Sequence, residues 1–326
     1  MLDAPDMPDV LLGTTGGVRR LRGGSAEPLG LQGERIAALH AGPEGVVLAG
    51  SYGGGLFRSE DRGESWARVE EGPREPTLRF LADDPSRPGA LLAGTEPARV
   101  FRSEDAGASW FELDGLGRID GHDRWFLPYS PRAGAARNVH GGPGRLLVSI
   151  EVGGLADSRD GGESWTCEPV LADEDVHEVS GHPSDPEVVY VALGTASLAR
   201  DGRRHGGIAR SRDGGATWER IETRYTRSVM VPPARADLVV ACPAGRVGRE
   251  GSIVVSDDGG DTWRPAGDGL EAPLEDMVER FVAAPDGSVW AICARGRVVR
   301  AEPGTWSWSQ VPGSERLTVE SVAFAG

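Results

Sequence analysis

The chain has 326 residues and a formal net charge of −15, and all 35 of its basic residues are arginine because it contains no lysine. The acidic balance disfavours nucleic acid as a partner, and the missing lysine excludes Schiff-base chemistry on that side chain. No signal peptide is visible after Met1 and no window approaches about eighteen consecutive apolar residues, so we expect a cytoplasmic protein without membrane contact. Cys167, Cys242 and Cys293 match no metal motif and are expected to be free thiols.

The first expected elements are two apolar strands over residues 9–21, joined by a turn of two threonines and two glycines. They resemble the middle of later strand groups, but no inner strand precedes them. The C-terminal residues 317–324 form an apolar strand without a partner of its own. We therefore expect the end of the chain to pair with its beginning, which would remove the exposed edges of the first sheet.

Five octapeptides follow, and all have the pattern Ser-x-Asp-x-Gly-x-Ser/Thr-Trp. They begin at Ser59, Ser103, Ser158, Ser211 and Ser256, at intervals of 44 to 55 residues. Serine and aspartate side chains close turns by bonding to nearby backbone groups, and glycine permits a positive φ angle. The tryptophan covers the turn with a large apolar face. Each octapeptide is therefore predicted to be a hairpin turn, and the spacing predicts a repeat architecture.

These octapeptides resemble the Asp-boxes, or BNR repeats, of sialidases, sortilin-type receptors, xyloglucan-degrading glycosidases and photosystem II assembly factors. The resemblance implies a β-propeller in which each box joins the third and fourth strands of a blade, away from the active face. It implies a structural role for the boxes and carries little information about activity. The ligand face is then expected at the opposite end, where strand one begins and strand two leads into strand three.

An all-β fold is predicted, a single β-propeller domain over residues 1–326 with seven blades, five Asp-box turns and closure of the first blade by the two chain ends. A six-bladed ring is the alternative if residues 9–21 do not form part of a blade. The other six blades are expected at residues 36–71, 75–114, 123–169, 175–222, 225–267 and 277–311.

Five expected inner strands share a feature six positions before the proline that ends them. The residues at this position are Arg79, Trp125, His177, Arg227 and Glu279. A strand that serves only the core would have valine or leucine there, so a polar ring at the channel mouth is predicted. The candidate catalytic residues at this end are Glu96, Glu151, Asp175, His177 and Tyr225. The candidate ligand-binding residues are Tyr52, Arg79, Arg124, Trp125, Arg227, Glu279 and Arg280.

Residues 121–144 admit two placements. In the preferred one, Trp125 lies on an inner strand and the extra loop 132–144 lies at the Asp-box end. In the alternative, the inner strand spans 135–141 and residues 121–126 form an insertion over the ligand face. A second long loop, residues 195–206, is expected to overhang the ligand face.

The chemistry of the candidate site stays open at this point. Sialidases hold a carboxylate with three arginines and use a tyrosine with a glutamate as nucleophile and an aspartate as acid. The Arg-Ile-Pro motif that precedes their first box is absent here, which disfavours a true sialidase. His177 with Glu96 and Glu151 could ligate a divalent ion, since imidazole and carboxylate suit several of them. No local histidine spacing supports such a site, so we expect neither a metal nor a cofactor, although the sequence does not decide whether a metal binds near His177.

Three functions are compatible with the sequence. The first is a soluble propeller that binds a small anionic or carbohydrate-like ligand in the channel mouth, with hydrolase or lyase activity left open. The second is a non-catalytic scaffold or assembly factor like the photosystem II factors, and the third is a lectin-like binder. The sequence does not decide the oligomeric state.

Overall fold

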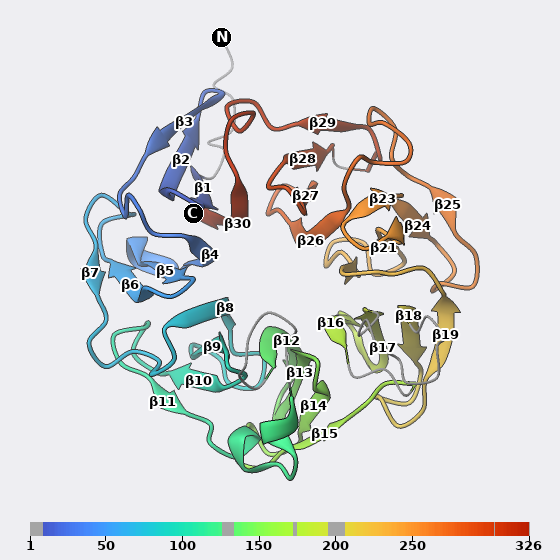
Figure 1. Cartoon of the computed structure of the whole chain (residues 1–326), viewed down its shortest axis with the longest axis horizontal. Coiled ribbons are helices and arrows are strands. Elements are labelled where there is room, and N and C mark those ends of the chain that lie inside the picture. The colour runs from blue at the N-terminus through green and yellow to red at the C-terminus, as the bar shows by residue number, and fades with distance from the viewer. Residues whose placement is uncertain (1–8, 126–133, 172–174, 195–205, 303, 326) are drawn as a thin grey trace.

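Short antiparallel strands form seven four-stranded sheets, which are arranged as a ring (Figure 1). The computed structural model describes residues 9–125, 134–171, 175–194, 206–302 and 304–325. In six sheets the strand that comes first in the chain lies nearest the axis of the ring, and in the remaining sheet the C-terminal strand does. The chain is therefore a seven-bladed β-propeller, as predicted. Within the described ranges, no helix has the length and apolar character needed to cross a membrane.

Six blades are formed by consecutive strands, from the axis outward. The second to fourth blades consist of β4 (Ile36–Ala41), β5 (Val47–Ser51), β6 (Gly55–Ser59), β7 (Ala67–Arg68), β8 (Thr77–Asp83), β9 (Leu91–Glu96), β10 (Val100–Ser103), β11 (Phe111–Glu112), β12 (Ala135–Gly142), β13 (Arg145–Glu151), β14 (Gly154–Ser158) and β15 (Thr166–Glu168). The fifth to seventh consist of β16 (Val176–His182), β17 (Asp185–Leu193), β18 (Gly207–Ser211), β19 (Glu219–Glu222), β20 (Val229–Met230), β21 (Val239–Ala241), β24 (Val254–Ser256), β25 (Arg264–Pro265), β26 (Val278–Ala283), β27 (Val289–Cys293), β28 (Val298–Ala301) and β29 (Trp308–Gln310). The hairpin of β22 (Ala244–Arg246) and β23 (Arg249–Gly251) adds to the sixth blade's loop.

The first blade is closed by the two ends of the chain, which confirms the predicted closure. Its strands are β30 (Val319–Ala325), β1 (Asp9–Thr14), β2 (Gly17–Arg22) and β3 (Ser25–Pro28). β30 pairs antiparallel with β1, so that Leu12 lies opposite Val322, and both side chains are buried. The closure leaves the inner edge of β1 covered.

The octapeptides form the turns between the third and fourth strands. In the box that begins at Ser211, the hydroxyl accepts a hydrogen bond from the Gly215 N–H at 2.7 Å and donates to Asp213 at 2.8 Å. Asp213 also accepts bonds from the Thr217 backbone and hydroxyl at 2.8 and 2.5 Å. The bonds from Thr217 and Ser211 lower the pKa of Asp213 to about 2. The same bond from the glycine N–H to the serine hydroxyl recurs in the other four boxes, so each box closes its own turn.

The fourth blade begins later than the preferred placement, which is therefore wrong. Its inner strand β12 begins at Ala135, as in the alternative. His122–Arg124 form a short 3-10 helix that begins after Gly121, and Trp125 stacks on His122 with ring centroids 4.5 Å apart. The proline that we used to align this strand lies in 126–133, outside the described residues. Most of the second long loop, 195–205, also lies outside them.

Candidate functional site

A β-bulge recurs near the start of the inner strands. The pairing with strand two shifts register around the residues Ala37, Arg79, Arg137, His177, Glu279 and Glu320. Arg227 takes the same place ahead of β20, because it stands two residues before Val229 as Glu279 stands two before Phe281. A bulged residue leaves the ladder, and its side chain is re-aimed. The bulges thus bring a series of polar side chains together near the axis.

A cavity of about 430 Å³ lies at this place, and we call it the axial pocket. Its polar lining consists of Arg35, Tyr52, Arg79, Arg137, Glu151, Arg227, Glu279, Arg280, Thr318 and Glu320. Ala37, Ile292, Cys293, Ala294 and Val319 supply apolar lining. The lining includes the ends of β13 and β27, where strand two leads into strand three, so the pocket opens at the end opposite the Asp-boxes. Its volume is that of a small-molecule site.

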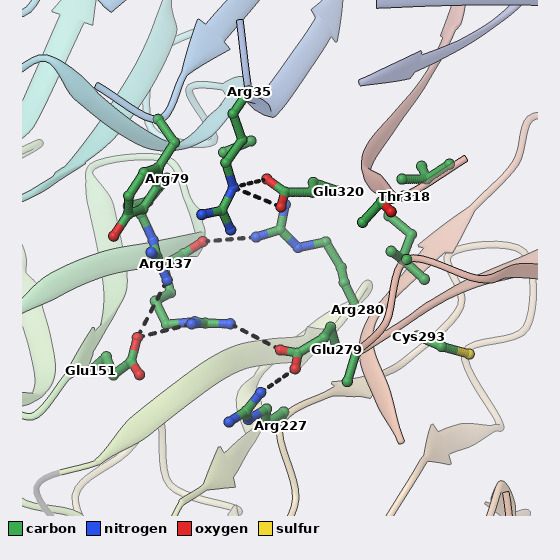
Figure 2. A pocket seen from close by; sticks show the side chains of 16 residues that line it. Arg35, Arg79, Arg137, Glu151, Arg227, Glu279, Arg280, Cys293, Thr318 and Glu320 are labelled. Atoms are coloured by element: carbon green, nitrogen blue, oxygen red, sulfur yellow. Dashed lines mark hydrogen bonds and ion pairs between the residues drawn. The ribbon is translucent and has the colours of Figure 1, made fainter. Parts of the chain in front are cut away.

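A chain of ion pairs crosses the axial pocket between blades (Figure 2). Glu151 lies 3.4 Å from Arg79 and 2.9 Å from Arg137, and Arg137 lies 3.7 Å from Glu279. Glu279 also pairs with Arg227. Burial alone would raise the pKa of Glu151, but the neighbouring charges of Arg137 and Arg79 hold it below its ordinary value. Glu151 is therefore a carboxylate at neutral pH.

A second group of charges includes Arg35 and Glu320, which also line the pocket. Glu320 accepts two hydrogen bonds from Arg35 Nε, at 2.7 and 2.9 Å. The Arg35 guanidinium stacks on the Tyr52 ring at 4.4 Å from its centroid. The Tyr52 hydroxyl donates to Glu96 at 3.4 Å, and Glu96 pairs with Arg79 at 3.1 Å. Four of the five pocket arginines thus have a carboxylate partner.

Arg280 is the exception among the pocket arginines. Its guanidinium donates to the backbone oxygen of Arg137 at 3.4 Å, and no carboxylate oxygen of the described residues lies within 4.0 Å of it. Burial lowers the pKa of Arg280, and the negative charge of Glu178 opposes this effect only in part. A guanidinium removed from water without an ion-pair partner is unfavourable. Arg280 therefore presents positive charge that the protein compensates incompletely.

Tyr225 lies behind the pocket lining in a short polar chain. Its hydroxyl accepts a hydrogen bond from Arg227 Nε at 2.6 Å and lies 3.2 Å from His177 Nε2. The same nitrogen of His177 lies 3.4 Å from Asp175. Burial raises the pKa of Tyr225 to about 12, although Arg227 acts against it. The phenol therefore stays protonated at neutral pH.

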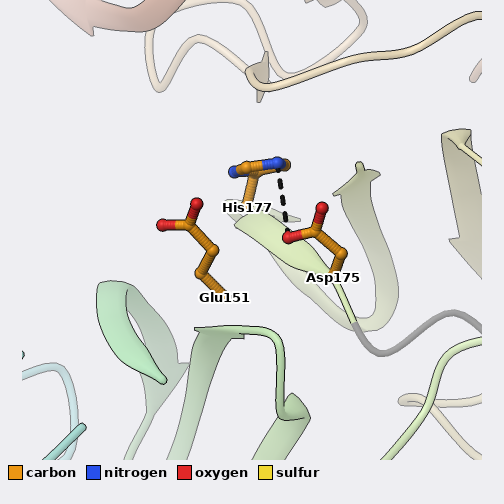
Figure 3. A group of neighbouring side chains, drawn as sticks. All are labelled: Glu151, Asp175 and His177. Atoms are coloured by element: carbon orange, nitrogen blue, oxygen red, sulfur yellow. Dashed lines mark ion pairs between the residues drawn. The ribbon is translucent and has the colours of Figure 1, made fainter. Parts of the chain in front are cut away.

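Asp175 and His177 lie close to Glu151 of the pocket lining (Figure 3). One potential ligand atom of each lies within 4.8 Å of the others, and all three residues are buried. Imidazole and carboxylate suit divalent ions. However, Arg137 and Arg79 already contact Glu151 and supply the positive charge that a cation would bring. We therefore assign the three residues to the polar network around the pocket.

The predicted site residues fall into three groups. Those that line the axial pocket are Tyr52, Arg79, Glu151, Arg227, Glu279 and Arg280. Those directly behind the lining, connected to it by the contacts above, are Glu96, Asp175, His177 and Tyr225. Arg124 and Trp125 belong to neither group, because both lie in the segment that precedes β12, and Arg124 is exposed. Arg137 occupies the ring position that we had assigned to Trp125.

The sequence did not indicate four charged residues of this region, which are Arg35, Arg137, Glu178 and Glu320. Arg137 was missed because the inner strand of the fourth blade was placed too early. A polar residue two positions before an inner-strand valine would have identified the two ring members that the proline alignment did not, Arg137 and Glu320. Residues with this spacing are Arg137, His177, Arg227 and Glu320.

No protein-family model matches the chain, and no curated protein matches its sequence. Solved structures do match. An ancestral GH74 enzyme aligns over 98% of this chain and 40% of its own, with 15% identity and a TM-score of 0.59. YCF48 bound to D1 peptide aligns over 88% of this chain and 91% of its own, with 16% identity and a TM-score of 0.59. The extracellular domain of a one-component system from B. thetaiotaomicron aligns over 94% and 39%, with 12% identity and a TM-score of 0.61.

The chain shares the fold of these propellers. At such identities the likeness concerns the fold alone, and it agrees with the resemblance drawn from the Asp-boxes. The chain spans 40% of the GH74 enzyme but 91% of YCF48. Because a GH74 enzyme and the peptide-bound YCF48 both have this architecture, the fold does not decide the function.

Proposed function

We propose that this propeller binds a small anionic ligand in the axial pocket. The observation that carries the proposal is Arg280, whose guanidinium lines the pocket and lacks a carboxylate within ion-pair distance among the described residues. A ligand carboxylate or phosphate beside Arg280 would supply the partner that the other four pocket arginines already have. The apolar lining from Ile292 and Ala294 would contact the body of the ligand. A sugar acid meets the same requirements, with Tyr52 offering a flat face to its ring.

The geometry supports binding more than hydrolysis. Glycosidase-type hydrolysis requires one carboxyl group whose raised pKa lets it act as an acid. Glu151, the predicted catalytic carboxyl group that lines the pocket, has a lowered pKa instead. Glu178, whose pKa burial raises, does not belong to the pocket lining. Tyr225, with a pKa of about 12, is a poor nucleophile at neutral pH. We therefore leave hydrolase and lyase activity out of the proposal.

A non-catalytic scaffold is the second candidate. It is favoured by YCF48, which has this fold over 91% of its length and whose structure holds a D1 peptide. A scaffold would bind a macromolecular partner, whereas the first candidate binds a small anion in isolation. The two are therefore separated by whether free small anions bind.

The test is calorimetric titration of the full chain with acetate, benzoate, glucuronate and inorganic phosphate. We expect at least one of them to bind with one site per chain. Arg280→Met should weaken that binding about tenfold or more, because a hydrogen bond to a charged group contributes about 1.5–3 kcal/mol. Arg235→Met is the matched control, since Arg235 is an exposed arginine paired with Asp237 and should bind as the wild type does. Absence of binding, or equal affinity of the Arg280 variant, would overturn the proposal.

A further inference from the structure

Glu178 is the residue that follows the bulge of β16, and it faces several other blades. Its carboxylate accepts a hydrogen bond from the Val229 N–H at 2.9 Å and another from the Ser228 hydroxyl, both at the start of β20. The cations that act on it are Arg280 from β26 and Arg137 from β12. No arginine of the described residues lies within 4.0 Å of its oxygens. Glu178 thus interacts with Arg280 at longer range than an ion pair.

The bond from Glu178 to the next blade does not require a charge. At the equivalent position of β12, the Asn138 side-chain oxygen accepts from the Val179 N–H at 2.9 Å. At the equivalent position ahead of β20, the Ser228 hydroxyl accepts from the Phe281 N–H at 2.9 Å. Neutral side chains therefore make the same contact between blades. Glu178 and Arg280 each follow the bulge of their inner strand, so they occupy equivalent positions in the ring of inner strands. The acid at Glu178 therefore adds an ionisable group at the level of Arg280 that the contact between blades does not need.

We propose that the axial pocket takes up a monovalent carboxylate together with one proton, and that Glu178 binds the proton. This inference rests on the proposed function. In the ligand-free protein, Glu178 supplies part of the negative charge that compensates Arg280. When a ligand carboxylate reaches Arg280, two anions compete for one guanidinium. Protonation of Glu178 removes their mutual repulsion and leaves the ligand as the sole partner of Arg280.

Glu178 changes its protonation state near neutral pH, where its proton can be coupled to the binding of a ligand carboxylate. Burial raises the pKa of Glu178 to about 7, although Ser228, Arg280 and the Val229 N–H act against it. A second negative charge nearby raises the pKa further. The protonated form is the one that favours the ligand, so affinity is highest below this pKa and falls as pH rises through it. The dissociation constant then increases by up to about tenfold per pH unit.

The test measures benzoate and glucuronate binding to the full chain between about pH 6 and pH 9, where the charge of neither ligand changes. Calorimetry in two buffers of different ionisation enthalpy reports the protons taken up. We expect wild-type affinity to fall with pH and up to one proton to be bound per ligand. Glu178→Gln keeps an oxygen for the Val229 N–H and should bind with the low-pH affinity throughout. Glu44→Gln, which changes an exposed glutamate, should keep the wild-type pH dependence.

The outcomes separate the inference from the function on which it rests. Carboxylate binding that does not depend on pH would overturn the inference and leave the proposed function standing, as would binding of phosphate alone. A Glu178→Gln variant with the wild-type pH dependence would also overturn the inference. Failure of all anions to bind, in wild type and variant alike, would overturn both.

Discussion

Two glutamates near the axial pocket have pKa values that move in opposite directions, although burial acts to raise both. Glu151 lies 2.9 Å from Arg137 and 3.4 Å from Arg79, and these cations outweigh the effect of burial, so that its pKa is lowered. Glu178 receives its hydrogen bonds from Ser228 and a backbone amide, and burial raises its pKa to about 7. Close positive charge therefore outweighs burial at Glu151, whereas burial outweighs the hydrogen bonds and the more distant cations at Glu178.

Glu178→Gln should stabilise the protein at alkaline pH and change its stability little at acidic pH. The folded-state pKa of about 7 lies above the ordinary value of 4.5, so folding favours the protonated acid and stability falls as pH rises between these values. The gain from the neutral amide is therefore present above about pH 7 and is at most about 3 kcal/mol. Partial solvent access of Glu178 makes this gain in the free energy of unfolding smaller. Urea denaturation at about pH 5 and pH 8 measures both values, and an equal effect at both would contradict the assignment.

Five junctions between blades use the same arginine contact. An arginine of one blade donates to the backbone oxygen of the fourth box residue in the next blade, and that residue has a positive φ in every case. The donors are Arg20, Arg58, Arg102, Arg145 and Arg210, and the acceptors are Arg62, Ala106, Gly161, Gly214 and Gly259. The Asp-box thus serves two blades, because it closes its own turn and also receives the arginine of its neighbour.

Arg102→Ala should be strongly destabilising. The guanidinium donates to Gly161 O at 2.8 Å and to Asp84 at 2.7 Å, and the Asp84 side chain is fully buried. Removing the arginine leaves that carboxylate buried without its cation, which costs about 3–5 kcal/mol. Arg235→Ala breaks an exposed pair and should cost less than about 1 kcal/mol. Chemical denaturation gives both free energies of unfolding, and similar losses in the two variants would show that the junction contact is unimportant.

The sequence contained enough information for the ring but not for the pocket. Each Asp-box is a local pattern of eight residues, and the strands around it follow from its turn chemistry. The inner strand of the fourth blade was placed wrongly because its position is set by pairing, with Val139 opposite Val148, and not by a proline. The pocket contacts join distant residues, as Arg137 and Glu279 do. A periodic pattern reports the position of a residue within its blade, and only the closed ring decides which residues meet across the axis.

Deleting residues 315–326 should prevent the ring from closing. β30 pairs with β1 from Asp9 opposite Ala325 to Thr14 opposite Val319, and the Val319 N–H also donates to Gly296 O of the seventh blade at 3.0 Å. The deletion exposes the edge of β1, separates the first and seventh blades and removes part of the pocket wall. We expect loss of the cooperative thermal transition and aggregation in size-exclusion chromatography.

Two comparisons separate loss of the strand from loss of its side chains. Glu320→Gln in the full chain removes the charge that pairs with Arg35 in the pocket lining but keeps β30, so it should retain the thermal transition. A synthetic peptide of residues 315–326 added to the truncated chain should restore part of the thermal transition. The peptide carries the backbone groups that pair with β1, and it does not need to be covalently joined to the chain to form these hydrogen bonds. A truncated chain that melts cooperatively at the wild-type temperature would show that the ring does not depend on this closure.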